Sequence, residues 1–98
     1  MMDLSDKQRK YLRGLAHDLK PTVFVGMGGV SESVLEEYRQ CLERHELIKV
    51  KLRLGSRDAR DEAIQTLVTS AKAELIKRIG NTAIIFRRKG QDPRIKLP

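Results

Sequence analysis

A glycine-rich turn offers the clearest chemistry in this sequence. Gly26, Gly28 and Gly29 fall within four positions, after the apolar run Val23–Val25 and before an acidic helical pattern that opens at Ser31. Glycine lets a ligand approach the backbone and tolerates positive φ. The unpaired amides at the start of a helix carry partial positive charge and suit a phosphate. A tight strand-to-helix turn that binds nothing is an equally good interpretation of these residues alone.

Positive charge is the second feature, and it is unevenly distributed. The 98-residue chain has 20 lysines and arginines, 13 acids and a formal net charge of +7. Lys49, Lys51 and Arg53 alternate with apolar residues, and from residue 77 onward seven cations stand against one acid. The helix expected at 32–44 is instead rich in glutamate. Clustered positive charge on a small domain favours a polyanionic partner, and nucleic acid before others.

Other kinds of chemical site find little support. Cys41 and His45 are four residues apart on an expected helix, but the sequence shows no third or fourth metal ligand near them. Cys41 falls in an apolar stripe, so we interpret it as a small buried residue. The glycines lack the last glycine of a dinucleotide fingerprint, and no Walker lysine follows them. We therefore expect no enzyme, no cofactor and no small-molecule substrate.

Composition also limits the setting in which the protein works. One cysteine excludes an internal disulfide and fits a reducing compartment. No apolar run has the length of a membrane span, and the N-terminus lacks a signal pattern. We expect a cytoplasmic monomer without membrane contact, folded as a single domain over residues 1–98.

The elements that must position the glycines and cations follow from apolar spacing and turn signals. We expect helices at 6–16, 32–44 and 58–73 and strands at 22–25, 46–54, 75–79 and 82–87. Ser5 and Gln8 form a capping box before the first helix, and Gly80-Asn81 is a hairpin turn. The order is α, β, α, β, α, β, β. The basic tail at 90–98 should be loosely held.

Alternation makes the second strand the clearest of the four. Its apolar residues share one side of the sheet, and Lys49, Lys51 and Arg53 share the other, as a solvated face or as a binding face. The first strand is apolar throughout at Val23–Val25, as expected of a strand in a βαβ unit. Leu15 is expected in the apolar stripe of the first helix.

Four blocks of sequence, taken together, resemble a known family. They are Gly-Leu-Ala-His-Asp-Leu-Lys-Pro at 14–21, Val-Gly-Met-Gly-Gly-Val at 25–30, His-Glu-Leu-Ile-Lys-Val-Lys at 45–51 and Ile-Gly-Asn-Thr-Ala-Ile-Ile-Phe-Arg at 79–87. In this order and spacing they resemble the CRM domain (chloroplast RNA splicing and ribosome maturation). The closest likeness is to its bacterial stand-alone form, the YhbY-like RNA-binding proteins, and it covers nearly the whole chain.

The resemblance implies both a fold and a function. The implied fold is a two-layer α/β (α+β) unit similar to the C-terminal domain of the third bacterial initiation factor, with an added N-terminal helix and a mixed sheet of strand order 1-2-4-3. The implied function is RNA binding on precursors of the large ribosomal subunit. The family's Gly-x-x-Gly loop, similar to that of KH domains, falls on Gly26–Gly29. The family usually carries a basic or polar residue inside this loop, whereas Met27 and Gly28 stand here.

The candidate RNA contacts therefore combine this loop with the basic faces. They are Lys20, Gly26, Met27, Gly28, Gly29, Lys49, Lys51, Arg53, Arg87, Arg88 and Lys89, with Arg9, Lys10 and Arg13 on the first helix. Aromatic residues for base stacking are few, so phosphate contacts should dominate. The alternative is a protein-interaction adaptor that uses the acidic helix at 32–44, with RNA contacts incidental.

Overall fold

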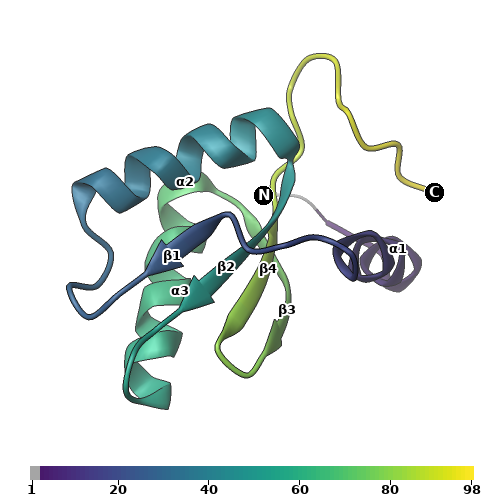
Figure 1. The fold of residues 1–98 in the computed structure, drawn as a ribbon. Helices are drawn as coiled ribbons and strands as arrows, with labels where there is room; N and C mark the ends of the chain where they lie inside the picture. Colours follow the sequence, from purple (N-terminus) through teal and green to yellow (C-terminus); the bar gives the residue numbers. More distant parts are fainter. Residues whose placement is uncertain (1–2) are drawn as a thin grey trace.

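A four-stranded sheet with helices on both faces forms the body of the protein (Figure 1). The computed structural model describes residues 3–98. The elements are α1 (Asp6–Ala16), β1 (Val23–Val25), α2 (Glu32–His45), β2 (Leu47–Leu52), α3 (Arg57–Ala71), β3 (Glu74–Ile79) and β4 (Thr82–Phe86). The sheet order is β1-β2-β4-β3, with β1 parallel to β2 and the other pairs antiparallel. The expected α+β class, element order and strand order are confirmed.

Two element boundaries differ from the expectation for local backbone reasons. β2 begins at Leu47 and not at residue 46, because Glu46 has a φ of 65° and cannot belong to a strand. α3 ends at Ala71 and not at residue 73, because Lys72 adopts the left-handed conformation that closes many helices. The remaining bounds agree within two residues.

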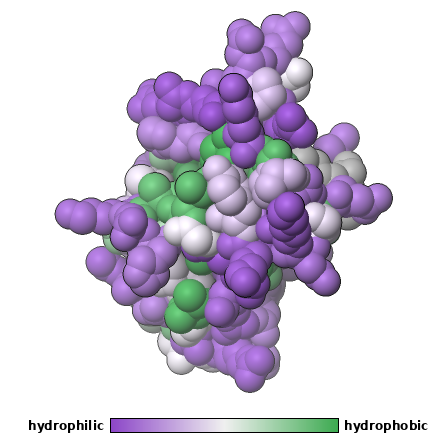
Figure 2. All heavy atoms as spheres, turned by 90° about the vertical axis from the view of Figure 1, so that its right-hand side faces the viewer, coloured by the Kyte–Doolittle hydropathy of each residue, from purple (hydrophilic) through white to green (hydrophobic). Residues whose placement is uncertain are grey.

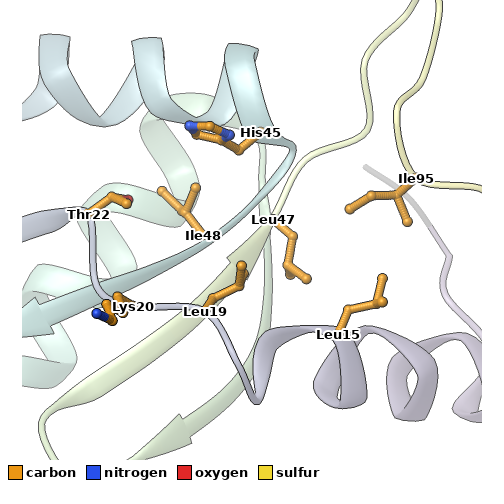
Figure 3. Close-up of a pocket in the computed structure, with 8 residues that line it drawn as sticks. All are labelled: Leu15, Leu19, Lys20, Thr22, His45, Leu47, Ile48 and Ile95. Carbon is orange, nitrogen blue, oxygen red and sulfur yellow. The ribbon is translucent and has the colours of Figure 1, made fainter.

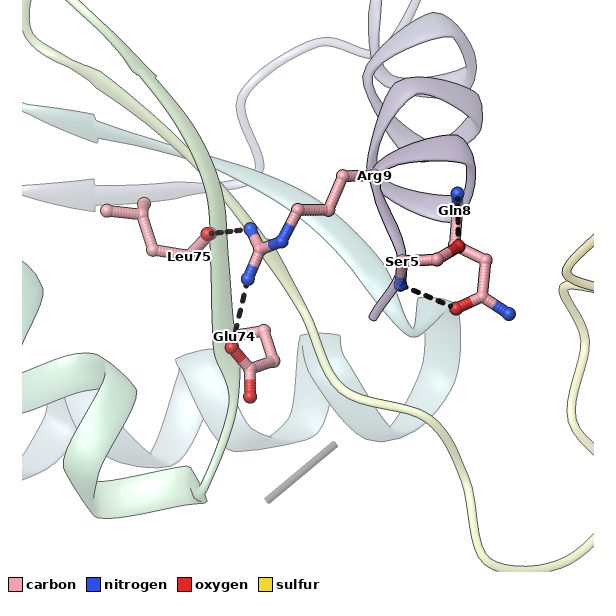
Figure 4. Close-up of polar contacts among 5 residues, drawn as sticks. All are labelled: Ser5, Gln8, Arg9, Glu74 and Leu75. Carbon is pink, nitrogen blue, oxygen red and sulfur yellow. Dashed lines mark hydrogen bonds and ion pairs between the residues drawn. The ribbon is translucent and has the colours of Figure 1, made fainter. Parts of the chain in front are cut away.

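A serine is the N-cap residue of each of the helices α1, α2 and α3. The Oγ of Ser5 accepts from the N–H of Gln8 at 3.1 Å, and the side chain of Gln8 accepts from the N–H of Ser5 at 3.0 Å (Figure 4). This confirms the expected capping box. Ser31 and Ser56 cap α2 and α3 with the same kind of bond. In each cap, the serine oxygen accepts a hydrogen bond from one of the amides that the first turn of a helix leaves unpaired.

The main core lies between the sheet and the helices α2 and α3. Tyr38 is fully buried there, and its hydroxyl donates to the carbonyl of Leu67 at 2.8 Å. Burial raises the pKa of Tyr38 well above its ordinary value, although the charges of Arg87 and Arg39 act in the opposite direction. The other buried members of this core include Val23, Val25, Leu42, Val50, Leu52, Ile64, Leu67, Ala83 and Ile85.

A smaller core lies on the opposite face of the sheet, beneath α1. Leu12 and Ala16 of α1 pack there against strand residues that include Leu47 and Phe86. Leu15 is instead 40% exposed, so the expected apolar stripe of this helix is buried only in part. α1 packs against β2 and β3, and Ile84 and Phe86 of β4 are buried between them, so this face is covered at β2, β4 and β3 but not at β1.

β1 shows the consequence of that partial cover. Val23 and Val25 are buried, but Phe24 between them is 47% exposed. The expected βαβ unit is present, since β1 and β2 are parallel and α2 connects them. Phe24 is exposed because β1 is an edge strand and α1 does not reach across to it.

The C-terminal tail, residues 90–98, makes contacts with the rest of the domain. It leaves the end of β4 and turns back towards α1 (Figure 1). Ile95 and Leu97 pack against the core beneath α1, and the side-chain amide of Gln8 donates to the carbonyl of Pro98 at 3.2 Å. Apolar contacts and hydrogen bonds thus attach the tail to the domain.

Candidate nucleic-acid interface

The Gly26–Gly29 loop is a single turn with an open backbone. The N–H of Gly29 donates to the carbonyl of Gly26 at 2.9 Å, and Gly29 has a φ of 74°, which favours glycine. Within residues 3–98, the amides of Met27 and Gly28 donate to no protein acceptor. A Cβ added at any of the three glycines would meet no atom within 4 Å. Free amides on an uncrowded turn can donate to a phosphate.

The start of α2 contributes less than the sequence indicated. The Oγ of Ser31 already accepts from the N–H of Val34 at 3.2 Å, and Glu32 places a negative charge in the first turn. Met27 is 87% exposed and adds no charge to the loop. An anion at this site must therefore rely on the amides of the turn and on neighbouring cations.

A hollow of about 360 Å³ lies between this loop and α3. Residues 27–30 form one wall, and α3 contributes Glu62 to the lining. The carboxylate of Glu62 repels anions, so this hollow is a poor site for a phosphate.

Arg53 stands next to the loop at the end of β2. Its N–H donates to the carbonyl of Val25 at 2.8 Å, which fixes the backbone beside the turn. Its guanidinium lies 5.0 Å from the centre of the Phe24 ring, within the range of a cation–π contact. Lys51 pairs in register with Phe24 and shares its side of the sheet. The structure thus brings together the loop, Lys51 of β2 and Arg53, which follows β2.

Three more arginines lie at the end of the sheet that holds the loop, and the sequence did not indicate them. Arg57, Arg60 and Arg78 line a hollow of about 320 Å³ with Gly80. Arg78 is paired with Asp61, while Arg57 is exposed and forms no ion pair in the part of the chain that the structure describes. Their signal was weak, because Arg57 and Arg60 are one turn apart at a helix start that also carries acids. We call the end that holds Gly26–Gly29, Arg53, Arg57 and Gly80 the loop end.

Arg87, Arg88 and Lys89 lie at the opposite end of the sheet. They follow the last residue of β4, whereas the Gly80 turn precedes its first residue. A strand of this length spans about 17 Å, so these cations do not join the loop. Instead, Arg39 and Arg44 of α2 share a hollow of about 580 Å³ with Arg87 and Lys89. The helix expected to be an acidic face therefore carries a basic patch as well.

Glu46 organises this second end, and the sequence analysis gave it no role. It is fully buried, and its carboxylate accepts from the backbone amides of Lys89 (2.8 Å), Arg94 (2.6 Å) and Ile95 (2.8 Å). Its carbonyl also accepts from the N–H of Arg87 at 2.9 Å. One glutamate beside a strand does not reveal partners 43 to 49 residues away. We call the end that holds Glu46, residues 87–89 and the tail the tail end.

The candidate cations of the first helix have different positions. Arg9 donates to the carbonyl of Leu75 at 3.0 Å and pairs with Glu74 at 3.4 Å, so it joins α1 to β3 (Figure 4). Lys10 and Arg13 are exposed. Arg9 therefore has a partner within the domain, and the other two can meet a ligand.

Lys20 and Lys49 are the remaining candidates, and Lys20 lines an apolar hollow of about 320 Å³ between α1, α2 and the tail (Figure 3). The Nζ of Lys49 donates to the carbonyl of His17 at 3.4 Å, and Lys20 is exposed. Lys20, Thr22 and His45 are the polar residues of the lining, and the others are Leu15, Leu19, Leu47, Ile48 and Ile95. Seen from the side of α1, the surface is mostly hydrophilic, with hydrophobic residues in small separate areas (Figure 2).

Two kinds of feature are absent from residues 3–98. No group of three or more histidine, cysteine, aspartate or glutamate side chains in this range is placed to hold a metal ion. No helix in the same range combines the length and apolarity needed to cross a membrane.

Comparison with known proteins connects this geometry to a family. Residues 4–87 match the family described as the CRS1 / YhbY (CRM) domain. An RNA-binding protein of Haemophilus influenzae is 39% identical over 100% of this chain and 98% of its own length. YqeI of Bacillus subtilis, named as a candidate RNA-binding protein, is 33% identical over 97% of this chain and 99% of its own.

A solved structure shares the fold. It is the solution structure of a hypothetical protein from Staphylococcus aureus, described as a candidate RNA-binding protein, and its TM-score is 0.82. The two chains are 35% identical, and the alignment covers 98% of this chain and 100% of the other.

Proposed function

This chain belongs to the CRS1 / YhbY (CRM) domain family, and we propose that it binds structured RNA, mainly through phosphates at the loop end. The observation that carries this proposal is the open turn, in which the amides of Met27 and Gly28 have no acceptor among residues 3–98 and the backbone is uncrowded. Arg53 and Arg57 are exposed cations at the same end. The RNA-binding names of the relatives support the same partner.

Salt dependence tests the phosphate contacts. Each phosphate that a lysine or arginine neutralises releases counterions, so contacts to several phosphates make affinity fall steeply with salt. A fluorescent hairpin RNA titrated at about 50 and 200 mM salt should lose affinity by orders of magnitude. An affinity that does not change with salt would contradict the proposal.

We extend the proposal to the setting of the protein. It acts as a cytoplasmic monomer, without a cofactor and without catalysis, on ribosomal RNA in precursors of the large subunit. The support is membership of the CRM family, because the letters stand for chloroplast RNA splicing and ribosome maturation. In sucrose gradients of cell extract, the protein should sediment with large-subunit precursors more than with mature ribosomes. Protein found only at the top of a low-salt gradient would contradict this setting.

The adaptor alternative rests on the exposed acids of α2. Glu32, Glu36, Glu37 and Glu43 all face solvent, but Arg39 and Arg44 lie on the same helix. If the adaptor were correct, a basic ribosomal protein would bind without RNA, and Glu36→Lys with Glu37→Lys would abolish that binding. The RNA-binding proposal expects the double variant to bind RNA at least as tightly as the parent, because it gains positive charge.

A further inference from the structure

An exposed aromatic ring lies on the part of the sheet that α1 leaves open. Phe24 points away from the main core, since both of its neighbours in β1 are buried in that core. In register with it across the sheet come Lys51 on β2, Thr82 on β4 and Ile79 on β3. Phe24 is 47% exposed and Ile79 is 57% exposed. A row of side chains thus crosses the sheet in contact with solvent.

The surroundings of this row are positively charged. The guanidinium of Arg53 lies 5.0 Å from the centre of the Phe24 ring. Lys49 and Lys77 pair with the next position of β4, one step along the same face. Among the strand residues of this face within 3–98, the one carboxylate is that of Glu74, which Arg9 neutralises at the far end. An anionic partner therefore meets no repulsion from the strands here.

We propose that Phe24 is a stacking platform for one unpaired base of the bound RNA, with Lys51 and Arg53 meeting the neighbouring phosphates. The inference rests on the proposed function and adds the kind of RNA that is recognised. An aromatic side chain stacks on any base, and base stacking is how single-stranded segments are held. A base inside a duplex cannot present its face, so this site requires unpaired nucleotides.

The distance to the loop supports a nucleotide as the occupant. Phe24 is two residues before Gly26, or about 7 Å along an extended strand. One RNA segment can therefore place a base on the ring and a phosphate against the turn. A second copy of this chain fits less well, because an isologous contact would bring Lys51 and Arg53 of the two copies towards each other.

The test compares two probes at one salt concentration. One is a hairpin RNA with a loop of eight adenosines, and the other is a fully paired RNA duplex with the same number of phosphates. Loss of one stacked base lowers affinity by about tenfold. Phe24→Ala should therefore bind the hairpin about tenfold more weakly and the duplex within about twofold of the parent.

Two variants control the comparison. Phe24→Tyr keeps an aromatic face and should restore hairpin affinity to within about twofold of the parent. Ile79→Ala removes an apolar side chain of similar exposure from the same row and should change neither affinity by more than about twofold. Far-UV circular dichroism checks that each variant is folded.

The outcomes separate the stacking site from the proposed function. Equal loss for hairpin and duplex, or no loss for either, would overturn the stacking site while RNA binding stands. A parent protein that binds neither probe would overturn both. A sedimentation coefficient of the RNA-free protein that falls in Phe24→Ala would assign this face to contact between copies and overturn the proposal. Quenching of 2-aminopurine in the hairpin loop by the parent, but not by Phe24→Ala, would support it directly.

Discussion

The loop end and the tail end both carry cations, but their backbone amides differ in whether they have an acceptor within the domain. At the loop end, the amides of Met27 and Gly28 are unpaired within the described chain and nothing crowds the glycines. At the tail end, the buried carboxylate of Glu46 accepts from three backbone amides. The first arrangement leaves hydrogen-bonding capacity for an external ligand, and the second uses it to hold the chain to itself. Basic residues alone therefore do not identify a binding site.

The largest effect should come from removing the carboxylate at the tail end. Glu46→Ala leaves the amides of Lys89, Arg94 and Ile95 without their acceptor, and bonds to a charged group are the stronger kind. We expect the free energy of unfolding to fall by about 3 kcal/mol. Urea unfolding measures this loss, and hydrogen exchange at the three amides should become faster.

A matched variant and RNA binding complete that comparison. Glu43→Ala removes an exposed carboxylate three residues earlier and should change stability by less than about 0.5 kcal/mol. RNA affinity of folded Glu46→Ala should stay within about threefold of the parent, because the loop end is untouched. A loss of affinity as large as that of a loop variant would make the tail end the principal site.

The next largest effect should come from blocking the loop. Gly29→Asp puts a side chain and a negative charge where a phosphate would approach, and we expect RNA affinity to fall by about thirtyfold. The positive φ of Gly29 also makes the variant less stable by about 1 kcal/mol, which circular dichroism and urea unfolding would reveal. Gly28→Ala adds no charge at a position without positive φ and is the milder form of the test.

Gly90→Asp places the same change at the tail end. Gly90 has open space around it and no positive φ, so the variant should fold as the parent does. Its RNA affinity should fall by less than about threefold. Equal losses for Gly29→Asp and Gly90→Asp would mean that added negative charge, and not the turn, explains the effect.

A smaller effect concerns the core beneath the tail-end cations. Tyr38→Phe removes a hydroxyl that donates to the carbonyl of Leu67, but Ser70 also donates to that carbonyl at 3.0 Å. The expected loss of stability is therefore about 1 kcal/mol. Because burial raises the pKa of Tyr38 in the folded state, the parent should lose stability above about pH 10, where the unfolded tyrosine ionises.

That alkaline loss should be smaller in Tyr38→Phe, which has no buried hydroxyl to ionise. Urea midpoints of the parent and of Tyr38→Phe at pH 9 and pH 11 provide the measurement. A parent and a Tyr38→Phe protein with the same pH dependence would show that the tyrosine does not resist ionisation.

The smallest effect compares single cations at the two ends. Lys51→Ala should leave the fold intact and lower the slope of log affinity against log salt by about one, as expected for one lost phosphate contact. Arg88→Ala removes the same charge at the tail end and should change the slope by less. The reverse ranking would place the principal phosphate contacts around residues 87–89.

The elements of this fold were predictable because their signals are local. The capping box of Ser5 and Gln8, the cap at Ser31 and the hairpin turn at Gly80 each depend on residues within a few positions. Alternation placed Lys49 and Lys51 on one side of β2, as the structure confirms. The strand order 1-2-4-3 followed from the family resemblance and not from periodicity.

The candidate site was predictable only in part. The glycine turn and the cations of β2 were selected from the sequence, and the structure places Arg53 beside that turn. Arg9 was selected as well, but its neighbour Glu74 is 65 residues away in the chain, so its pairing could not be foreseen. The exposure of Phe24 was missed for a similar reason, because it depends on how far α1 extends across the sheet.

The sequence by itself determined the helices, the strands, the turn at Gly26–Gly29 and the excess of positive charge. Only the tertiary structure decided which cations are engaged within the domain, that Glu46 binds the tail, and that Phe24 faces solvent beside the turn. The physical reason is the distance along the chain over which each interaction acts. Backbone preference and side-chain period act over a few residues, whereas burial and charge pairing depend on segments that meet only when the chain has folded.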